Sequence, residues 1–195
     1  MPCAGEYRGA TAMTESMQLV TVRPAVEEDI SALLGLDHGY STEYVWQMEL
    51  DQGVHKMGVR FREARLPRPM QVVYPRPKDQ LQEYWQRRAA LLVAENSDQP
   101  IGYASLATGM APGAAWLVDL VVGASQRRKG VGTRLVLAAQ SWAHHHGQRR
   151  LVLEMQSKNH PAIRLAQKLA FEFSGYNDRY YENQDIALFF AKRLD

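Results

Sequence analysis

Cysteine is almost absent from this chain of 195 residues, because Cys3 is the only one. A single cysteine excludes an intrachain disulfide, and its position near the N-terminus makes it an unconvincing nucleophile for a covalent intermediate. The sequence also lacks any apolar run that approaches the roughly 18 residues of a membrane helix. Its start lacks the apolar core of a signal peptide. We therefore expect a cytoplasmic protein with no membrane partner.

Neither sign of charge dominates the composition. The chain has 23 Lys and Arg against 21 Asp and Glu, which gives a formal net charge of +2. This balance excludes a general basic field, so we expect no nucleic-acid partner. The hydrophobic content of 46% suits one domain with a sizeable core. We predict a single domain over residues 18–195, preceded by an N-terminal extension over residues 1–17, which are small, polar and aperiodic.

A basic glycine loop between a strand and a helix is the most informative motif. The apolar, β-branched run 116–122 before it is typical of a buried strand. After the loop, apolar residues recur at helical spacing as far as Gly147, a residue type that commonly ends helices. The first amides of a helix have no partner, the helix dipole is positive there, and glycines let a phosphate approach the backbone. The sequence therefore predicts an anion site at Arg127-Arg128-Lys129-Gly130-Val131-Gly132.

Two common phosphate motifs do not fit this loop. A Walker loop counted from Gly123 fails because Arg128 stands where its second glycine belongs. A dinucleotide fingerprint would require glycine where Leu135 stands. The pattern that remains, Arg-x-x-Gly-x-Gly after a hydrophobic strand, resembles the pyrophosphate loop of the GNAT N-acetyltransferase superfamily, which binds acetyl-CoA. The resemblance implies that the cofactor-binding residues of this loop are Arg127, Arg128, Lys129, Gly130, Val131, Gly132 and Thr133.

The segments that follow the loop strengthen this resemblance. In the superfamily, an asparagine after the next strand opens a short helix that ends in a Leu-Gly-Phe-like turn, and residues 159–171 resemble this unit. The resemblance implies that Asn159 contacts coenzyme A, although helix capping explains this residue equally well. The pattern matches from 118 to 194. Strand 153–156 and the aromatic segment 187–191 are most similar to the streptothricin acetyltransferase branch.

The order of the segments predicts an α/β (α+β) fold. We expect a mixed, mostly antiparallel central sheet of about seven strands with helices on both faces. Strands are expected at 19–23, 89–95, 100–108, 116–122, 150–156, 171–177 and 186–192, and helices after Pro24 and at 131–146 and 160–169. The resemblance implies that strand 116–122 is splayed from its parallel neighbour at the acetyl-CoA site. It also implies that pantetheine and the thioester carbonyl bind the freed backbone of Leu120, Val121 and Val122.

Residues 38–88 are long for a connection in a compact domain, so we expect this elaborated segment to carry structure and function. Tyr44, Trp46 and Met48 alternate with polar residues, and a helix-like segment follows Pro77. One hypothesis is that an extra hairpin and helix cover the acceptor side of the cleft. The alternative is that these aromatic residues are simply core of an elaborated sheet.

Two carboxylates lie in otherwise apolar strands, where a buried charge without a purpose is costly. Asp119 and Glu154 are therefore candidates for the general base or its water relay. The resemblance places the usual base at Asp119, on the strand before the phosphate loop. The alternative is that one or both carboxylates are structural and paired to a nearby Arg or Tyr.

The general acid for the leaving thiolate is missing from its usual place. Ala166 stands where many superfamily members carry a tyrosine that protonates this thiolate. Either the thiolate leaves unassisted, or another hydroxyl acts instead. The predicted catalytic substitute is Tyr176, with Tyr180 and Tyr181 as further candidates and ordinary packing as the alternative for each.

Three consecutive histidines at 144–146 do not predict a metal site. Adjacent helix positions point about 100° apart, so the three side chains cannot grip one ion together. We expect no metal, and we interpret these residues as favourable partners of a helix C-terminus.

Together these patterns predict an enzyme that transfers an acetyl group from acetyl-CoA, its co-substrate, to a primary amine by direct attack in a ternary complex. The alternatives are an acyltransferase that uses another acyl-CoA and a non-catalytic acyl-CoA-binding or regulatory module. The acceptor is a small-molecule or peptide amine whose identity the sequence does not reveal. Closing strands in this superfamily often form dimer contacts, so a homodimer is an open expectation.

Overall fold

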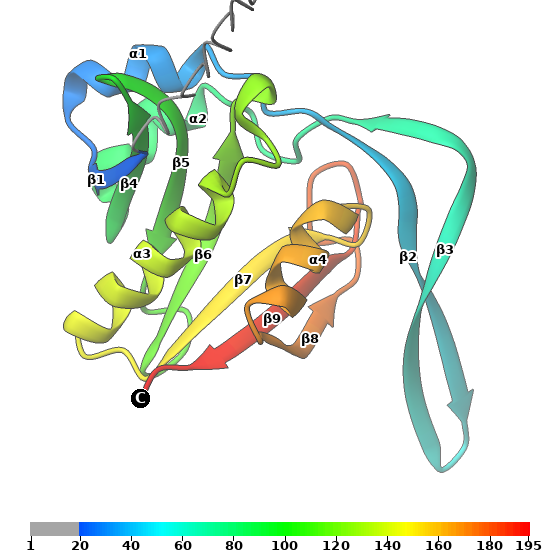
Figure 1. Cartoon of the computed structure of the whole chain (residues 1–195). Coiled ribbons are helices and arrows are strands. Elements are labelled where there is room, and N and C mark those ends of the chain that lie inside the picture. The colour runs from blue at the N-terminus through cyan, green and yellow to red at the C-terminus, as the bar shows by residue number, and fades with distance from the viewer. Residues whose placement is uncertain (1–19) are drawn as a thin grey trace, which may run out of the picture.

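The computed structural model describes residues 20–195, and the predicted extension over residues 1–17 lies outside them (Figure 1). Seven strands form one sheet in the order β1-β4-β5-β6-β7-β9-β8, and two others form a separate hairpin, β2–β3. Neighbours in the large sheet are antiparallel except for the parallel pair β6–β7. The strands of this sheet are β1 (Thr21–Pro24), β4 (Ala90–Asn96), β5 (Gln99–Ala107), β6 (Ala114–Val122), β7 (Arg150–Gln156), β8 (Glu172–Asn177) and β9 (Ala187–Arg193). The mixed, mostly antiparallel sheet predicted from the sequence is confirmed.

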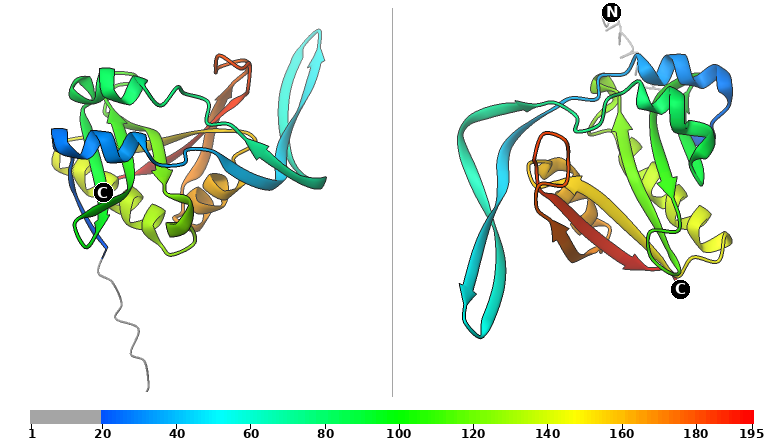
Figure 2. Two further views of the ribbon diagram at one scale, coloured as in Figure 1. Left: turned by 90° about the horizontal axis from the view of Figure 1, so that it is seen from above. Right: turned by 180° about the vertical axis from the view of Figure 1, so that it is seen from behind.

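Helices cover both faces of the large sheet (Figure 1, Figure 2). Their bounds are α1 (Glu27–Leu34), α2 (Gln80–Tyr84), α3 (Val131–His145) and α4 (His160–Lys168), with short 3-10 turns at Trp85–Arg87 and Ala124–Gln126. Side chains alternate between the faces along each strand. Val93 of β4 therefore packs with α1 and α2, whereas its neighbour Ala94 packs in the larger core under α3 and α4.

Local residue types account for one tight turn and two helix ends. Ser97 and Asp98 have positive φ angles of 48° and 60° in the two-residue turn between β4 and β5. Gly147 follows α3 in the left-handed conformation, with φ of 69°. The Asn159 side chain accepts a hydrogen bond from the Ala162 amide at 3.1 Å and caps α4.

Strands β6 and β7 diverge halfway along their length. They pair only as far as Leu117 and Leu153. At the same point Val118 is an extra residue of β6, without a partner in the register with β5, and such a bulge bends and twists its strand. The resulting fork leaves one edge of β6, over residues 118–122, without a neighbouring strand. This is the splay that the resemblance implied.

Most of the elaborated segment 38–88 is a long hairpin that projects beyond the sheet (Figure 1). Its strands are β2 (Tyr40–Gly53) and β3 (Lys56–Val72). It attaches to the body near α4, where the Trp46 amide donates a hydrogen bond to the Ser157 carbonyl at 2.9 Å, and it is exposed on both faces over residues 51–60.

The two parts of this segment lie in different places. The segment after the hairpin returns over the sheet as α2, and Leu81 of α2 is buried against α1 and the sheet. Helix α2 therefore covers the sheet face that carries Asp119, whereas the hairpin packs beside α4. Within the described residues, no helix has the length and apolar character needed to cross a membrane.

Candidate active site

The fork between β6 and β7 opens a cleft in the centre of the sheet. Its walls come from both strands and from α4, and they include Leu120, Glu154, Gln156, Asn159, Leu165 and Tyr181. A second cleft lies beside it under α2, where Asp119, Tyr84, Trp85 and Tyr103 face one another. Tyr74 and Arg76, from the segment between the hairpin and α2, line both clefts. The two clefts thus meet at these two side chains.

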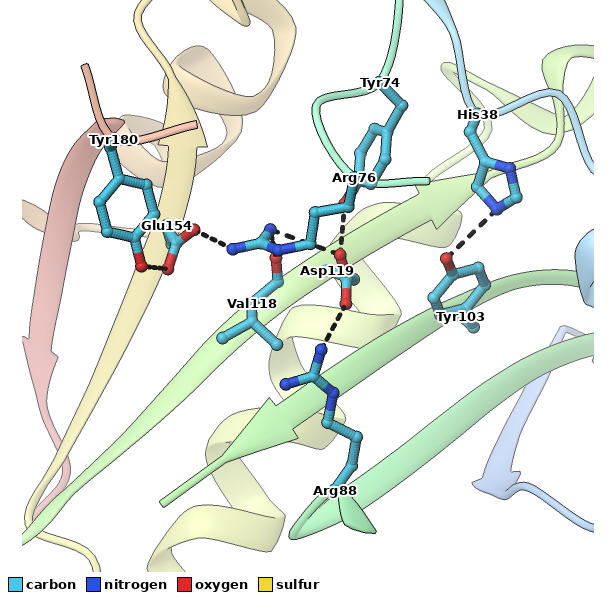
Figure 3. A network of polar contacts seen from close by, with 9 residues as sticks. All are labelled: His38, Tyr74, Arg76, Arg88, Tyr103, Val118, Asp119, Glu154 and Tyr180. Atoms are coloured by element: carbon cyan, nitrogen blue, oxygen red, sulfur yellow. Dashed lines mark hydrogen bonds and ion pairs between the residues drawn. The ribbon is translucent and has the colours of Figure 1, made fainter. Parts of the chain in front are cut away.

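Arg76 bridges the two diverging strands (Figure 3). Its Nη1 donates to the carbonyl of the bulge residue Val118 at 2.7 Å and lies 3.5 Å from Asp119 Oδ1. Its Nη2 donates to Glu154 Oε1. Burial opposes the charge of Arg76, but the two carboxylates outweigh it, so the pKa of Arg76 is raised. One guanidinium therefore pairs with both predicted catalytic carboxylates.

Asp119 and Glu154 are both buried, and their carboxylate oxygens differ in the number of hydrogen bonds that they accept. Asp119 Oδ1 accepts from the Tyr74 hydroxyl at 2.9 Å, while Asp119 Oδ2 has the Arg88 guanidinium at 3.8 Å, beyond hydrogen-bond distance. Glu154 Oε2 accepts from the Tyr180 hydroxyl at 3.1 Å, and Oε1 is held by Arg76. Asp119 therefore retains an oxygen that can accept a hydrogen bond from a substrate.

Tyr176, the predicted catalytic tyrosine, is partly buried and packs against the larger core, whereas Ala166 lies within that core. Tyr176 packs against Phe61 of β3, with ring centroids 5.3 Å apart, and lines neither of the two clefts. Ala166 is fully buried in the core beneath α4. Tyr181 does line the fork, and burial, followed by the charge of Glu154, raises its pKa, so its hydroxyl remains protonated.

The predicted phosphate loop has a helix N-terminus with free amides. Gly130 adopts φ of 84° at the N-cap without any side-chain cap, and Arg134 N makes the first helical hydrogen bond, to Gly130 O at 3.1 Å. The amides of Val131, Gly132 and Thr133 precede that bond, so they are available to an anion. The side chains of Arg128 and Lys129 are exposed beside them.

Arg127 has a different role from its two basic neighbours. Its Nε donates to the Val122 carbonyl at 2.9 Å, and its Nη2 donates to the Asp37 carbonyl at 2.6 Å. The side chain thus ties the phosphate loop to the end of β6 and to the loop between α1 and β2. The contact of Arg127 with a cofactor remains a prediction. These two hydrogen bonds limit the guanidinium nitrogens that could make it.

The backbone of residues 120–122 lies at the open edge of the fork. Gly123 N donates to Ile101 O on β5 at 2.9 Å, and successive residues of a strand point their backbone groups to opposite sides. The backbone groups of Leu120 and Val122 therefore point into the fork, and those of Val121 point towards β5. Val122 O is already bonded to Arg127, which leaves the Leu120 and Val122 amides for a ligand.

Sequence reasoning did not identify Tyr103, which lines the second cleft, or His38, which contacts it (Figure 3). His38 Nε2 lies 3.2 Å from the Tyr103 hydroxyl. Burial, and then the charge of Lys78, lower the pKa of His38, so its imidazole is neutral at neutral pH. Burial raises the pKa of Tyr103. His38 is a single histidine in a polar loop, so neither hydrophobic periodicity nor a sequence motif indicated a functional role for it.

Arg76 and Tyr74 were missed for a related reason. Both lie in the elaborated segment, and Arg76 is 78 residues from its partner Glu154 in the sequence. The available signal was local: an arginine held between Pro75 and Pro77 has a restricted backbone and is a suitable partner for carboxylates expected nearby.

The consecutive histidines end α3 as the sequence analysis interpreted them. His145 Nδ1 lies 2.7 Å from Ser141 O, and His146 Nδ1 lies 2.8 Å from Trp142 O. These contacts satisfy carbonyls in the last turn of the helix. Among the described residues, no group of three or more His, Cys, Asp or Glu side chains is arranged to hold a metal ion.

Comparisons with known proteins agree on one family. The sequence model of the Acetyltransferase (GNAT) family matches residues 60–171. The streptothricin acetyltransferase of Streptomyces lavendulae is 26% identical over 165 residues, which cover 82% of this chain and 85% of that protein.

Two solved structures share the fold. The crystal structure of nourseothricin acetyltransferase superimposes with a TM-score of 0.76 at 22% identity and covers 90% of this chain and 99% of its own. A candidate streptothricin acetyltransferase from Bacillus anthracis str. Ames, solved in complex with acetyl coenzyme A, gives a TM-score of 0.72 at 20% identity and covers 91% and 99%.

Proposed function

The chain belongs to the acetyltransferase (GNAT) family, and we propose that it transfers the acetyl group of acetyl-CoA to a primary amine by direct attack in a ternary complex. It is therefore an acetyl-CoA-dependent N-acetyltransferase. The observation that best supports the proposed mechanism is the junction of the two clefts. The open edge of β6 lies on one side of Arg76, and the free oxygen of Asp119 lies on the other.

In this proposal the phosphate loop binds the pyrophosphate of acetyl-CoA, and the fork binds its pantetheine arm. The pyrophosphate meets the amides of Val131, Gly132 and Thr133 and the side chains of Arg128 and Lys129. Pantetheine then lies along the open edge of β6. The Leu120 amide is a donor for the thioester carbonyl, on which negative charge develops during attack. Asn159 lines the fork, but its side-chain oxygen caps α4, so it contacts coenzyme A only through its remaining polar groups.

The amine approaches through the second cleft. Asp119 Oδ2 accepts a hydrogen bond from the amine and orients its lone pair towards the thioester carbon. Glu154 holds Arg76 in place rather than contacting the amine, because its side chain has no exposed surface and both of its oxygens are bonded. We thus assign a substrate contact to Asp119 and a positioning role to Glu154.

A tyrosine serves the leaving thiolate in this proposal. Tyr181 is the candidate that lines the fork, and its hydroxyl remains protonated. Tyr176, which the sequence analysis favoured, stays a prediction, and its packing against Phe61 makes it the weaker candidate. Donation of the Tyr181 proton to sulfur would complete the release of free coenzyme A.

The names of the relatives suggest which acceptor to test first. One relative is a streptothricin acetyltransferase, so we propose a streptothricin-class antibiotic as the acceptor. The charge near the cleft does not select strongly for a cation, because Arg76, Arg88 and Lys78 outnumber Asp119 and Glu154. Small amines and peptide N-termini are therefore part of the same test.

The test measures free thiol released from acetyl-CoA in the presence of a panel of amines: streptothricin, a polyamine, free amino acids and a short peptide. The expected result is thiol release with at least one amine and a mass increase of that amine by one acetyl group. Calorimetry with acetyl-CoA alone reports binding independently. A protein that binds acetyl-CoA but releases no thiol with any amine would instead support the non-catalytic binding module.

A further inference from the structure

We propose that Tyr103 and His38 form the route by which the acceptor amine loses its proton, a role that rests on the proposed function. Acetylation of an amine removes one proton from its nitrogen, and that proton must leave the buried site. The carboxylates at the site are poorly suited to keep this proton. The neutral imidazole of His38, in contrast, contacts the hydroxyl of Tyr103, which lines the second cleft.

Both carboxylates already form ion pairs with Arg76. Glu154 bonds Arg76 and Tyr180, and Asp119 bonds Tyr74 and lies beside two guanidinium groups. A carboxylate that retained the proton would leave the partly buried charge of Arg76 with one partner fewer, which is costly. Asp119 can orient the amine through Oδ2, but the proton needs a further acceptor.

Tyr103 reaches from the amine side of the sheet to His38. In the register between β5 and β6, Tyr103 pairs with Val121 and Ser105 pairs with Asp119, so Tyr103 and Asp119 are diagonal neighbours on one face. Both line the second cleft. The Tyr103 hydroxyl lies 3.2 Å from His38 Nε2, and the two rings meet edge to face at 5.8 Å.

The charges around His38 favour proton acceptance followed by release. Burial and the cations Lys78 and Arg127 lower the pKa of His38, whereas Asp119 and Asp37 oppose them. Tyr74 from the segment before α2 also packs on the ring, with centroids 5.7 Å apart. The imidazole is thus neutral before the reaction, and the nearby cations promote loss of its proton to solvent from a half-buried position.

Acetyl transfer forms one bond to nitrogen and breaks one bond to sulfur. The amine nitrogen attacks the thioester carbon, the new C–N bond forms, and the C–S bond breaks with its electron pair leaving on sulfur. The N–H proton passes to the Tyr103 oxygen as the Tyr103 proton passes to His38 Nε2. Because the pKa of Tyr103 is raised, the tyrosine remains a neutral relay and never accumulates as phenolate.

The loop that carries His38 is joined to the phosphate loop. Arg127 Nη2 donates to the carbonyl of Asp37, the residue before His38. The position of the imidazole therefore depends on the same loop that we assign to pyrophosphate, which places the proton route next to the acetyl-CoA site.

The test compares the rate–pH profiles of kcat for His38→Gln and Tyr103→Phe with the wild-type profile, using the amine of fastest turnover. We expect the wild-type rate to rise with pH through a step below the ordinary histidine pKa. In each variant this step should vanish, and kcat at neutral pH should fall roughly 10²- to 10⁴-fold, the usual range for a lost general base. The KM for acetyl-CoA should stay unchanged. The double variant should be no slower than the slower single variant, because both residues serve one route.

The matched control is His144→Gln, which removes an exposed imidazole at the far end of α3 and should leave the profile intact. Retention of the wild-type step and rate in His38→Gln or in Tyr103→Phe would overturn the proton route while leaving the proposed function standing. If His38→Gln does not fold, Tyr103→Phe decides the question alone. Failure of the wild-type protein to release thiol with any amine would instead overturn the proposed function.

Discussion

Arg76 and Glu154 form an ion pair that spans the fork between the diverging strands β6 and β7. The guanidinium comes from neither strand, yet it also bonds the carbonyl of the bulge residue Val118. One side chain from the elaborated segment therefore joins the two strands that form the proposed acetyl-CoA site. The segment 38–88 contributes to the site through this arginine and α2, while its hairpin packs elsewhere.

The first prediction concerns the stability supplied by Arg76. Arg76→Met should lower the free energy of unfolding by about 3–5 kcal/mol, because it leaves two buried carboxylates without their shared partner. Arg62→Met is the matched control: Arg62 pairs with Glu49 on the exposed hairpin, so its loss should cost less than about 1 kcal/mol. Urea denaturation measures both. Equal effects of the two substitutions would contradict the bridging role.

The second prediction concerns the phosphate loop. The double charge reversal Arg128→Glu/Lys129→Glu should weaken acetyl-CoA binding at least about tenfold, equivalent to roughly 1.4 kcal/mol, and should flatten the salt dependence of binding. Both residues are exposed, so the fold should persist. Lys168→Glu, an exposed reversal at the end of α4, is the control. Calorimetry at two salt concentrations measures the effect, and unchanged affinity would move the pyrophosphate away from this loop.

Much of the fold could be predicted because its signals are local. The apolar strands, Gly147 after α3 and the Asn159 cap each depend on a few consecutive residues, and the structure confirms them. The neighbouring position of β6 and β7, which carry Asp119 and Glu154, was predictable too, since a helix joining two buried strands favours a parallel pair.

The site was less predictable because its contacts are distant in sequence. Arg76 is 43 residues from Asp119 and 78 from Glu154, and no repeat or motif links them. His38 pairs with Tyr103 across 65 residues. The family resemblance supplied a base by position, but it could not show that both carboxylates share one arginine, because Arg76 lies outside the motifs that carry the resemblance.

The third prediction separates the two carboxylates. Asp119→Asn should lower kcat by roughly 10²-fold, because an amide nitrogen can take the place of the oxygen that orients the amine. Glu154→Gln should mainly destabilise the fold, since it removes a charge from the buried pair with Arg76. The acetyl-CoA affinity of both variants should match that of the wild type. Steady-state kinetics and urea denaturation together measure the split, and the reverse pattern would exchange the two roles.

The fourth prediction concerns the leaving thiolate. Tyr181→Phe should lower kcat without weakening acetyl-CoA binding, because the change deletes only the hydroxyl and keeps the packing. Tyr176→Phe is the control for the alternative assignment and should leave kcat unchanged if its role is packing against Phe61. A rate loss confined to Tyr176→Phe would restore the assignment made from the sequence.

A substitution at Ala166 tests whether a tyrosine at this position could assist the leaving thiolate. Ala166 has no exposed surface and lies in the larger core, so Ala166→Tyr should destabilise the protein by overpacking, typically by about 1–3 kcal/mol. Installing the tyrosine at this position should therefore not raise turnover. A stable, faster Ala166→Tyr variant would show that the core beneath α4 adapts and that thiolate departure in the native protein is unassisted.

The last prediction uses the pH dependence of stability to test His38 without any substrate. The pKa of His38 is lowered in the folded protein, so the unfolded chain binds this proton more readily. Its contribution to the free energy of unfolding is therefore fully present above the ordinary histidine pKa of about 6.5 and is lost as the pH falls through the folded value. His38→Gln should flatten this part of the stability–pH curve, whereas the exposed substitution His144→Gln should not change it. Urea midpoints measured from neutral to mildly acidic pH provide the comparison. Parallel curves for wild type and His38→Gln would mean that the imidazole is as easily protonated in the folded state as in the unfolded chain, and a neutral proton acceptor at this position would lose its physical basis.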